Sequence, residues 1–271
     1  MVKETEANAW QLKMFQKTLK KKLRLKALKK HIDHLDPDDS CLLITCGDNN
    51  GAINYYLRKI GGKWTWADHE KKSIQEMSEL LGEPVQHIQP DALPYPDNYF
   101  DCVISIDVHE HLFDPIPFTK ELNRVTRSAG KVIITVPNGD ETKFATRIKN
   151  FVGMTKEKYG HFREGLNVLE LKNLMRHCRI EPVAATTFSK FFTEMLELCI
   201  NFMYVMVLAK KSKTKVESGT IAPATKAQLK SVEKNYRMYA YIYPFFQIVS
   251  KLDILQFATS GYVVMVEGRK E

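Results

Sequence analysis

The residues best suited to bind a ligand lie between Cys41 and Gly51, in the segment CLLITCGDNNG. An apolar run ends there in a short turn that contains Gly47, Asn49 and Gly51, residue types that allow close backbone approach or tight turns. If a helix follows directly, its first backbone N–H groups lack partners within the helix and face a polar or anionic ligand. Strand, turn and helix together predict a cradle for a nucleotide-like cofactor.

A carboxylate downstream strengthens this prediction. Asp68 follows the segment KWTWA, which alternates as a second strand, and it comes after Gly51 at nearly the spacing of about 20 residues that separates the loop from the ribose-binding acid in doubly wound folds. The alternative role for Asp68 is to cap a helix over residues 70–81. We expect Asp68 to hold ribose hydroxyls.

Strands and helices alternate through the first two thirds of the chain. We expect strands at 41–46, 63–67, 85–89, 100–106, 131–136 and 181–188, with a last one at 261–268. Between them we expect helices at 52–60, 70–81, 116–127 and 168–178. Such alternation implies parallel crossovers and an α/β sheet that is covered on both faces.

The positive charge of the chain is concentrated near its beginning. There are 40 lysines and arginines against 32 aspartates and glutamates, a net charge of +8, and no acid lies between Ala7 and Ile32. Apolar residues there recur every three or four positions, which predicts one long amphipathic helix within residues 1–38. Its cationic face is either solvated or contacts a membrane surface or an anionic substrate. No nucleic-acid recognition motif accompanies the charge, so no specific nucleic-acid partner is expected.

The cysteines indicate the compartment. Five are present, with no CxxC pair and no secretory signal. This pattern is typical of a cytoplasmic protein and argues against a disulfide framework or a zinc site.

The order of the segments resembles the class I S-adenosylmethionine-dependent methyltransferases, in the type 11 group that includes the ubiquinone and menaquinone methyltransferases. The matching pieces are LLITCGDNNG, WADHEKKSI, PDALPYPDNYFDCVISIDVHEHL and GKVIITVPN, within residues 42–183, and GYVVMVEG suits the closing strand. The resemblance implies a Rossmann-like, mostly parallel seven-stranded sheet with an antiparallel last strand. It also implies S-adenosyl-L-methionine as cofactor and methyl transfer to a small-molecule or lipid-linked acceptor.

Carried over position by position, the resemblance implies eight cofactor-binding residues. They are Gly47, Asn49, Gly51, Asp68, Asp91, Ala92, Ile106 and Asp107. The loop residues would lie under the methionine and ribose parts, and Asp68 would hold the ribose. Asp91 would meet the adenine amino group and the Ala92 N–H the ring, while Ile106 and Asp107 would pass beside the methionine.

The chain departs from the family pattern at two positions. Thr45 stands where an acid usually precedes the loop, and Asn49 stands at the middle glycine, where a positive φ is expected. These changes leave open a noncatalytic binding module with a degenerate cofactor loop. A nicotinamide-dependent oxidoreductase is a further alternative, although the loop lacks the third glycine of the dinucleotide motif.

Methyl transfer is an in-line displacement that depends mainly on alignment, and a hydroxyl or carbon acceptor adds a need for a base. We expect His161 to be that base, with His111 as a second catalytic candidate; Asp107, His109 and Glu164 are weaker ones. His161 and Arg163 lie after the fifth strand, where Arg163 would clamp the substrate. The alternative is a surface turn in which Glu164 or Asn167 caps the next helix.

We expect no metal at the His109-Glu110-His111 triplet, because adjacent residues cannot converge on one ion as the histidines of HExxH do on a helix.

The segment 189–258 is expected to form a helical substrate cap inserted into the methyltransferase domain, which comprises 39–188 and 259–271. Its apolar run, 191–209, has an uncharged part much shorter than the about 20 residues that span a bilayer. It is either a buried helix over the site or an element peripheral to the membrane. A flexible link over 212–226 and an aromatic segment that Pro244 breaks or kinks complete the cap.

Overall fold

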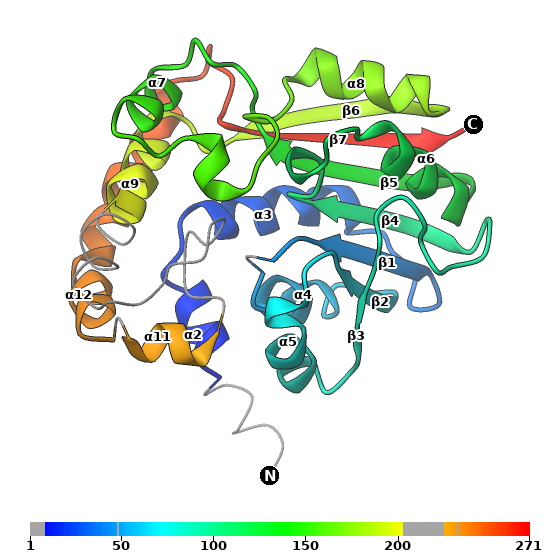
Figure 1. Ribbon diagram of the computed structural model, residues 1–271, viewed down its shortest axis with the longest axis horizontal. Coiled ribbons are helices and arrows are strands. Elements are labelled where there is room, and N and C mark those ends of the chain that lie inside the picture. Colours follow the sequence, from blue (N-terminus) through cyan, green and yellow to red (C-terminus); the bar gives the residue numbers. More distant parts are fainter. Residues whose placement is uncertain (1–8, 48, 203–224, 232) are drawn as a thin grey trace.

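The computed structural model describes residues 9–47, 49–202, 225–231 and 233–271. Its centre is a seven-stranded sheet with the order β3-β2-β1-β4-β5-β7-β6 (Figure 1). The strands are β1 Ser40–Thr45, β2 Lys63–Asp68, β3 Val85–His87, β4 Phe100–Ile106, β5 Thr126–Pro137, β6 Ile180–Phe188 and β7 Val263–Lys270. Strands β1 to β5 pair in parallel, and β7 runs antiparallel to both β5 and β6. The predicted Rossmann-like methyltransferase architecture is confirmed.

Helices surround this sheet on both faces and at the end toward which the parallel strands point. They are α2 Trp10–Phe15, α3 Lys20–Ile32, α4 Ala52–Leu57, α5 Ile74–Leu81, α6 Ile116–Val125, α7 Phe144–Phe151, α8 Val168–His177, α9 Phe191–Phe202, α11 Lys226–Ser231 and α12 Glu233–Ser250. Short 3-10 turns occur at η1 Lys71–Ser73, η2 His109–His111, η3 Lys156–Tyr159 and η5 Lys251–Leu255.

The core has two layers because side chains alternate along each strand. On one face, Leu43 of β1 packs in a cluster with Leu28 of α3 and Met77 of α5. On the other face, its neighbour Leu42 packs with Phe118 of α6 and with α8. All five side chains are fully buried. The sheet therefore holds the loops at the carboxyl ends of its parallel strands on a rigid base.

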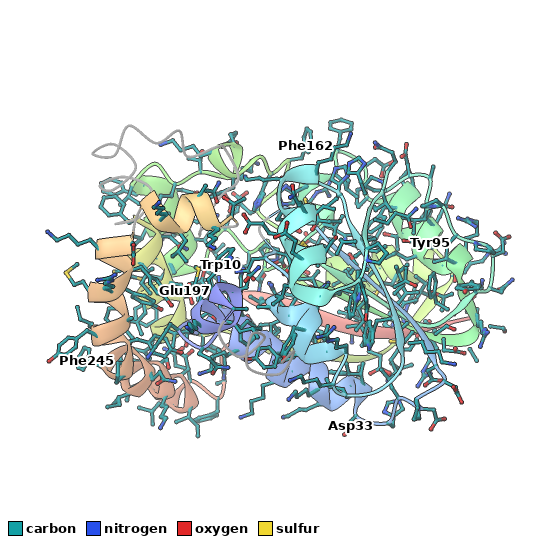
Figure 2. All side chains as sticks on the ribbon, turned by 90° about the horizontal axis from the view of Figure 1, so that it is seen from below. Trp10, Asp33, Tyr95, Phe162, Glu197 and Phe245 are labelled. Carbon is teal, nitrogen blue, oxygen red and sulfur yellow. The ribbon has the colours of Figure 1, made fainter. Side chains whose placement is uncertain are left out.

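The basic N-terminal segment forms two helices, so the prediction of one long helix is wrong. The chain turns between Phe15 and Lys20, and the side chain of Glu197 on α9 accepts hydrogen bonds from the backbone N–H groups of Leu19 (3.3 Å) and Lys20 (3.1 Å). A carboxylate at these unpaired N–H groups favours a helix start. Figure 2 shows Glu197 and Trp10 on the same side of the molecule.

Helices α7, α9 and α12 lie at the end of the sheet toward which the parallel strands point (Figure 1). Asp253 of η5 accepts hydrogen bonds from the backbone of Lys190 (2.9 Å) and Phe192 (2.8 Å), which ties the two ends of the cap segment together. Helix α12 runs through Pro244 without a break, so of the expected break or kink the break is wrong and the kink stays a prediction. The expected link, and the part of the apolar run beyond Phe202, lie mostly outside the described residues.

Within the described part of the chain, no helix is both long and apolar enough to cross a membrane.

Candidate functional site

The loop between β1 and α4 requires glycine at two positions. Gly47 has a φ of 52° and Gly51 a φ of 86°, values that residues with a Cβ adopt rarely. A Cβ on Gly47 would collide with the carboxylate of Glu70, and one on Gly51 would come within 3.2 Å of the Met77 backbone. Glycine at both positions thus allows the tight turn between β1 and α4 that a cofactor loop needs.

The Asp68 carboxylate fastens this loop to the tip of β2. It is fully buried and accepts hydrogen bonds from the Thr45 hydroxyl (2.6 Å) and from the backbone N–H groups of Gly47 (3.0 Å) and Glu70 (2.8 Å). The threonine that departs from the family pattern therefore has a structural role. An acid at position 45 would place a second carboxylate against the buried Asp68. Repulsion between the two like charges would disfavour that arrangement.

Asn49 also braces the loop. Its amide donates to Thr45 Oγ1 (3.2 Å) and Asn54 Oδ1 (2.8 Å), and its own oxygen accepts from the Gly51 N–H (3.1 Å). The positive φ angles of the described loop residues fall on Gly47 and Gly51, so the expected positive φ at Asn49 is wrong.

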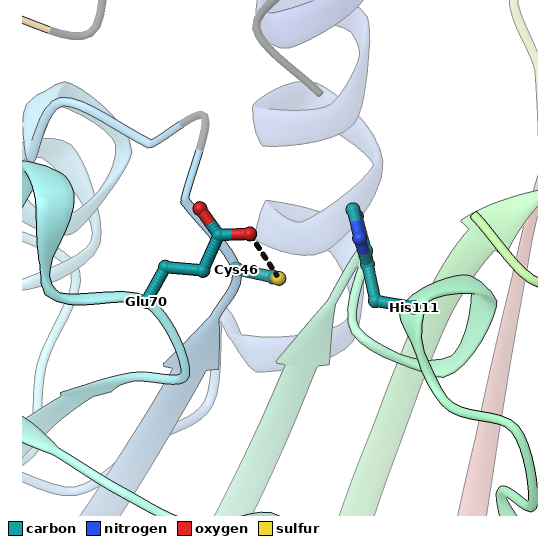
Figure 3. A group of neighbouring side chains, drawn as sticks. All are labelled: Cys46, Glu70 and His111. Carbon is teal, nitrogen blue, oxygen red and sulfur yellow. Dashed lines mark hydrogen bonds between the residues drawn. The ribbon is translucent and has the colours of Figure 1, made fainter. Parts of the chain in front are cut away.

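Glu70 carries a second carboxylate beside the loop. Its side chain is partly exposed and reaches over Gly47, and Glu70 Oε1 lies 4.0 Å from the Cys46 sulfur (Figure 3). Sequence reasoning missed Glu70, although it is two residues beyond the acid that the spacing identified.

Helix α3 contributes to the methionine end of the predicted site. Arg24 forms an ion pair of 2.5 Å with Asp107, the residue after β4, which has a φ of 51°. A small cavity beside them is lined by Phe15, Lys21, Arg24, Thr45, Asn49, Asn50, Ile53 and Ile106. The structure thus brings Ile106 and Asp107 to the loop as expected, and it adds two cations from the basic helix.

Asp91 and Ala92 lie in the turn after β3, the strand next to β2. Asp91 is exposed, and the Ala92 N–H donates to the Gln89 carbonyl at 3.2 Å. The adenine contacts predicted for both residues remain predictions.

The histidines after β4 separate into two environments. His109 is buried, its Nε2 lies 3.2 Å from Thr119 Oγ1 on α6, and burial lowers its pKa to about 3. His111 instead packs its ring against that of His161, with centroids 4.5 Å apart at 79°.

The loop that carries His161 is anchored on this turn. The Phe162 N–H donates to the Glu110 carbonyl (2.9 Å), and the Arg163 guanidinium donates to the Phe113 carbonyl (2.8 Å). In this structure Arg163 therefore positions the loop, and its predicted part in binding substrate remains a prediction. Asn167, through a capping box with Glu170, caps α8.

A cavity of about 110 Å3 lies beside the loop, beneath α7 and α9. Its lining consists of Lys20, Pro137, Asn138, Ala145, Thr146, Lys149, Met154, Tyr159, His161, Glu164, Glu194, Leu198, Asn201 and Tyr262. Glu164 is buried and forms an ion pair of 2.8 Å with Lys149. Burial, with smaller effects from His111 and Lys149, lowers the pKa of His161 to about 3, so this imidazole is neutral near pH 7.

Comparisons with known proteins agree with the fold and the loop. Residues 42–134 match the family model of the methyltransferase domain. Probable S-adenosylmethionine-dependent methyltransferases of Mycolicibacterium smegmatis and Mycobacterium tuberculosis are 29% and 28% identical over 96 and 94 residues. Each match covers 34% of this chain and only about a third of the relative, 36% and 34% respectively.

Solved structures share the fold over most of the chain. A putative sarcosine dimethylglycine methyltransferase from Galdieria sulphuraria has a TM-score of 0.53 at 15% identity, covering 91% of this chain and 84% of that one. Geranyl diphosphate C-methyltransferase from Streptomyces coelicolor has a TM-score of 0.56 at 10% identity, covering 93% and 79%. The chain thus has the fold of these methyltransferases, and its residues 42–134 match the methyltransferase domain model.

Proposed function

We propose that the protein transfers the methyl group of S-adenosylmethionine to an acceptor bound in the cavity beside His161. The observation that carries this proposal is the tight turn between β1 and α4, with Gly47 and Gly51 at positive φ and the Gly47 N–H bonded to Asp68. The cofactor supplies an electrophilic methyl group on a sulfonium. The chain binds the cofactor at the carboxyl ends of β1, β2 and β4, next to the cavity.

The cofactor contacts divide between carboxylates and backbone. Three donors already share the Asp68 carboxylate, so Asp68 shapes the cradle and shares the ribose hydroxyls with Glu70, whose carboxylate reaches over Gly47. Arg24 and Lys21 suit the methionine carboxylate, because both line the small cavity at that end of the loop. We retain Gly51, Asn49, Ile106 and Asp107 beside the methionine and ribose, and Asp91 and Ala92 at the adenine.

Alignment of the acceptor accounts for most of the proposed catalysis. A histidine whose pKa is about 3 is a weak base near pH 7, where an efficient base has a pKa close to the working pH. His161, with His111 behind it, is therefore proposed to orient the acceptor and to accept a proton only from an acidic one. The ion pair of Lys149 and Glu164 forms a second polar wall of the cavity.

Calorimetric titration of the purified protein with S-adenosylhomocysteine tests the proposal. We expect saturable binding that Asp68→Ala weakens strongly, because the mutation releases the loop from β2. Asp38 is exposed and lies before β1, so Asp38→Ala is the matched control and should bind S-adenosylhomocysteine as the wild type does. Absence of binding by the wild type would favour the noncatalytic module, and a preference for nicotinamide dinucleotides would favour the oxidoreductase.

We further propose that the acceptor is lipid-linked and that the protein works at a membrane surface. Helix α12 buries Tyr243 against the N-terminal segment, where its hydroxyl donates to the Thr18 carbonyl at 3.1 Å. The outer face of α12 and η5 is apolar and exposed, as Phe245 shows in Figure 2. The exposed apolar side chains are Met238, Tyr241, Ile242, Phe245, Ile248, Leu252, Ile254, Leu255 and Phe257.

The charge around this face suits anionic lipid. Lys234 and Lys251 are exposed in the same segment, while Arg237 pairs with Glu233 at 2.6 Å. An apolar helix face flanked by cations binds anionic interfaces. Cosedimentation with vesicles that contain phosphatidylserine should capture the wild type but not Phe245→Asp/Ile248→Asp. Exposed Tyr99→Asp is the control and should be captured. Equal recovery of the apolar-face variant with such vesicles would contradict the surface.

A further inference from the structure

We infer that Glu110, His111 and His161 form a binding site for a divalent transition metal ion. One ligand atom from each lies within 4.8 Å of the other two, which is close to the spacing of ligands around one ion. Two imidazoles and a carboxylate are a ligand set that zinc, manganese and iron accept. Adjacent residues alone would not make this site; the third ligand arrives from a loop after β5.

The geometry of the cluster is fixed by contacts outside it. The turn η2 carries Glu110 and His111, and the backbone hydrogen bond from Phe162 to the Glu110 carbonyl (2.9 Å) holds the second loop against it. Arg163 bonds the Phe113 carbonyl (2.8 Å) from the same loop. The two histidine rings are already in contact. Pre-positioned ligands reduce the ordering that metal binding would otherwise require.

The polar atoms of the cluster also point to a ligand. His161 Nδ1 is buried and has no hydrogen-bond partner among the described residues, an arrangement that is costly unless something binds there. Glu110 is only 1% exposed, and a bound cation would offset the cost of burying its negative charge.

The position of the cluster relates it to the reaction. His161 lines the acceptor cavity, while His111 also lies near Cys46 and Glu70 at the cofactor loop (Figure 3). Cys46, Glu70 and His111 form a second group whose ligand atoms lie within 4.8 Å of one another. We assign the ion to the Glu110 group, because Cys46 and Glu70 lie where the cofactor is proposed to bind.

A metal ion at this point favours an oxygen acceptor, a conclusion that rests on the proposed function. Bound to the ion, an acceptor hydroxyl loses its proton to water more readily. The oxygen then forms a bond to the methyl carbon, and the carbon–sulfur bond breaks with its electron pair moving to sulfur. The products are the methylated oxygen and neutral S-adenosylhomocysteine, so charge and atoms balance.

Titration of the full chain with Mn2+, followed by electron paramagnetic resonance, tests the site without an acceptor. We expect one bound ion per chain, and an affinity that Glu110→Gln and His161→Asn each lower by about tenfold or more. Exposed His177→Asn on α8 is the matched control and should bind normally. Circular dichroism of each variant establishes that it is folded.

Three outcomes would overturn the inference. One is the absence of stoichiometric Mn2+ binding by the wild type, and another is equal affinity in His161→Asn and His177→Asn. The third is a loss confined to Cys46→Ala, which would assign the ion to the second group instead. Calorimetry with S-adenosylhomocysteine in the presence of a chelator measures cofactor binding without the metal. Cofactor binding without Mn2+ binding would therefore contradict this inference and leave the proposed function intact.

Discussion

Arg24 on α3 forms an ion pair of 2.5 Å with Asp107, the residue directly after β4. The two side chains are 8% and 16% exposed, so the pair is largely shielded from water. It joins the N-terminal helix to the strand end where the cofactor is proposed to bind. The basic segment is therefore part of the structure of the site as well as a source of surface charge.

The pair leads to a prediction on stability. Arg24→Met removes the ion pair with the largely shielded Asp107 carboxylate, and the free energy of unfolding should fall by about 3 kcal/mol. Urea unfolding measures the loss. The double variant Arg24→Met/Asp107→Asn should recover part of it, and Lys26→Met, an exposed cation on the same helix, should unfold like the wild type. A loss no larger than that of Lys26→Met would contradict the buried pair.

A second prediction separates backbone strain from ligand contact in the loop. Gly47→Ala and Gly82→Ala both place a Cβ at a positive φ, 52° and 66°, and each should cost about 1–2 kcal/mol of stability. A Cβ at Gly82 meets nothing within 4 Å, whereas one at Gly47 collides with Glu70. Calorimetry should therefore show S-adenosylhomocysteine binding lost in Gly47→Ala and retained in Gly82→Ala. Similar affinities in both variants would place the cofactor elsewhere.

The fold was predictable where local pattern and burial agree. The bounds of β4 match the expected 100–106, because this apolar run is buried on both faces. Strand β5 begins at Thr126 rather than near 131, and there it pairs with Phe100 across an irregularity in register. The break between α2 and α3 depends on Glu197 of α9. Such long-range contacts leave no trace in local periodicity.

The candidate site likewise has parts that the sequence predicts and parts that depend on long-range contacts. The loop and Asp68 come together as expected, because their spacing reflects a strand, a helix and a strand of ordinary length. The contact of Arg24 with Asp107, and that of His111 with His161, join segments far apart in the sequence. Composition showed that cations and histidines were present, but only the fold shows which ones meet.

A third prediction distinguishes the two carboxylates after β2. Asp68→Asn removes a charge that accepts three hydrogen bonds, so unfolding should become easier by about 1–3 kcal/mol and S-adenosylhomocysteine should bind weakly. Glu70→Gln should change stability by less than about 0.5 kcal/mol, since its side chain is partly exposed. It should still weaken binding about tenfold, which is about 1.4 kcal/mol. Unchanged affinity in Glu70→Gln would leave the ribose to Asp68 alone.

The fourth prediction concerns acid pH and the buried His109. Its pKa is lowered to about 3 in the folded protein, mainly by burial and secondarily by Arg163, so the folded state keeps this ring neutral. The unfolded chain binds a proton below about pH 6.5, and stability should therefore fall as the pH drops from about 6.5 toward 3. The contribution of His109 at pH 5 is a loss of about 2 kcal/mol.

Urea unfolding at a series of pH values measures this slope. His161, whose pKa is also lowered to about 3, adds a second contribution, so the comparison must be made between variants that keep it. His109→Gln should reduce the loss of stability between pH 7 and 5, whereas exposed His177→Gln should leave it as in the wild type. Equal slopes in the two variants would show that His109 already takes up its proton in the folded state, in which case its burial against α6 could not be the cause of acid sensitivity.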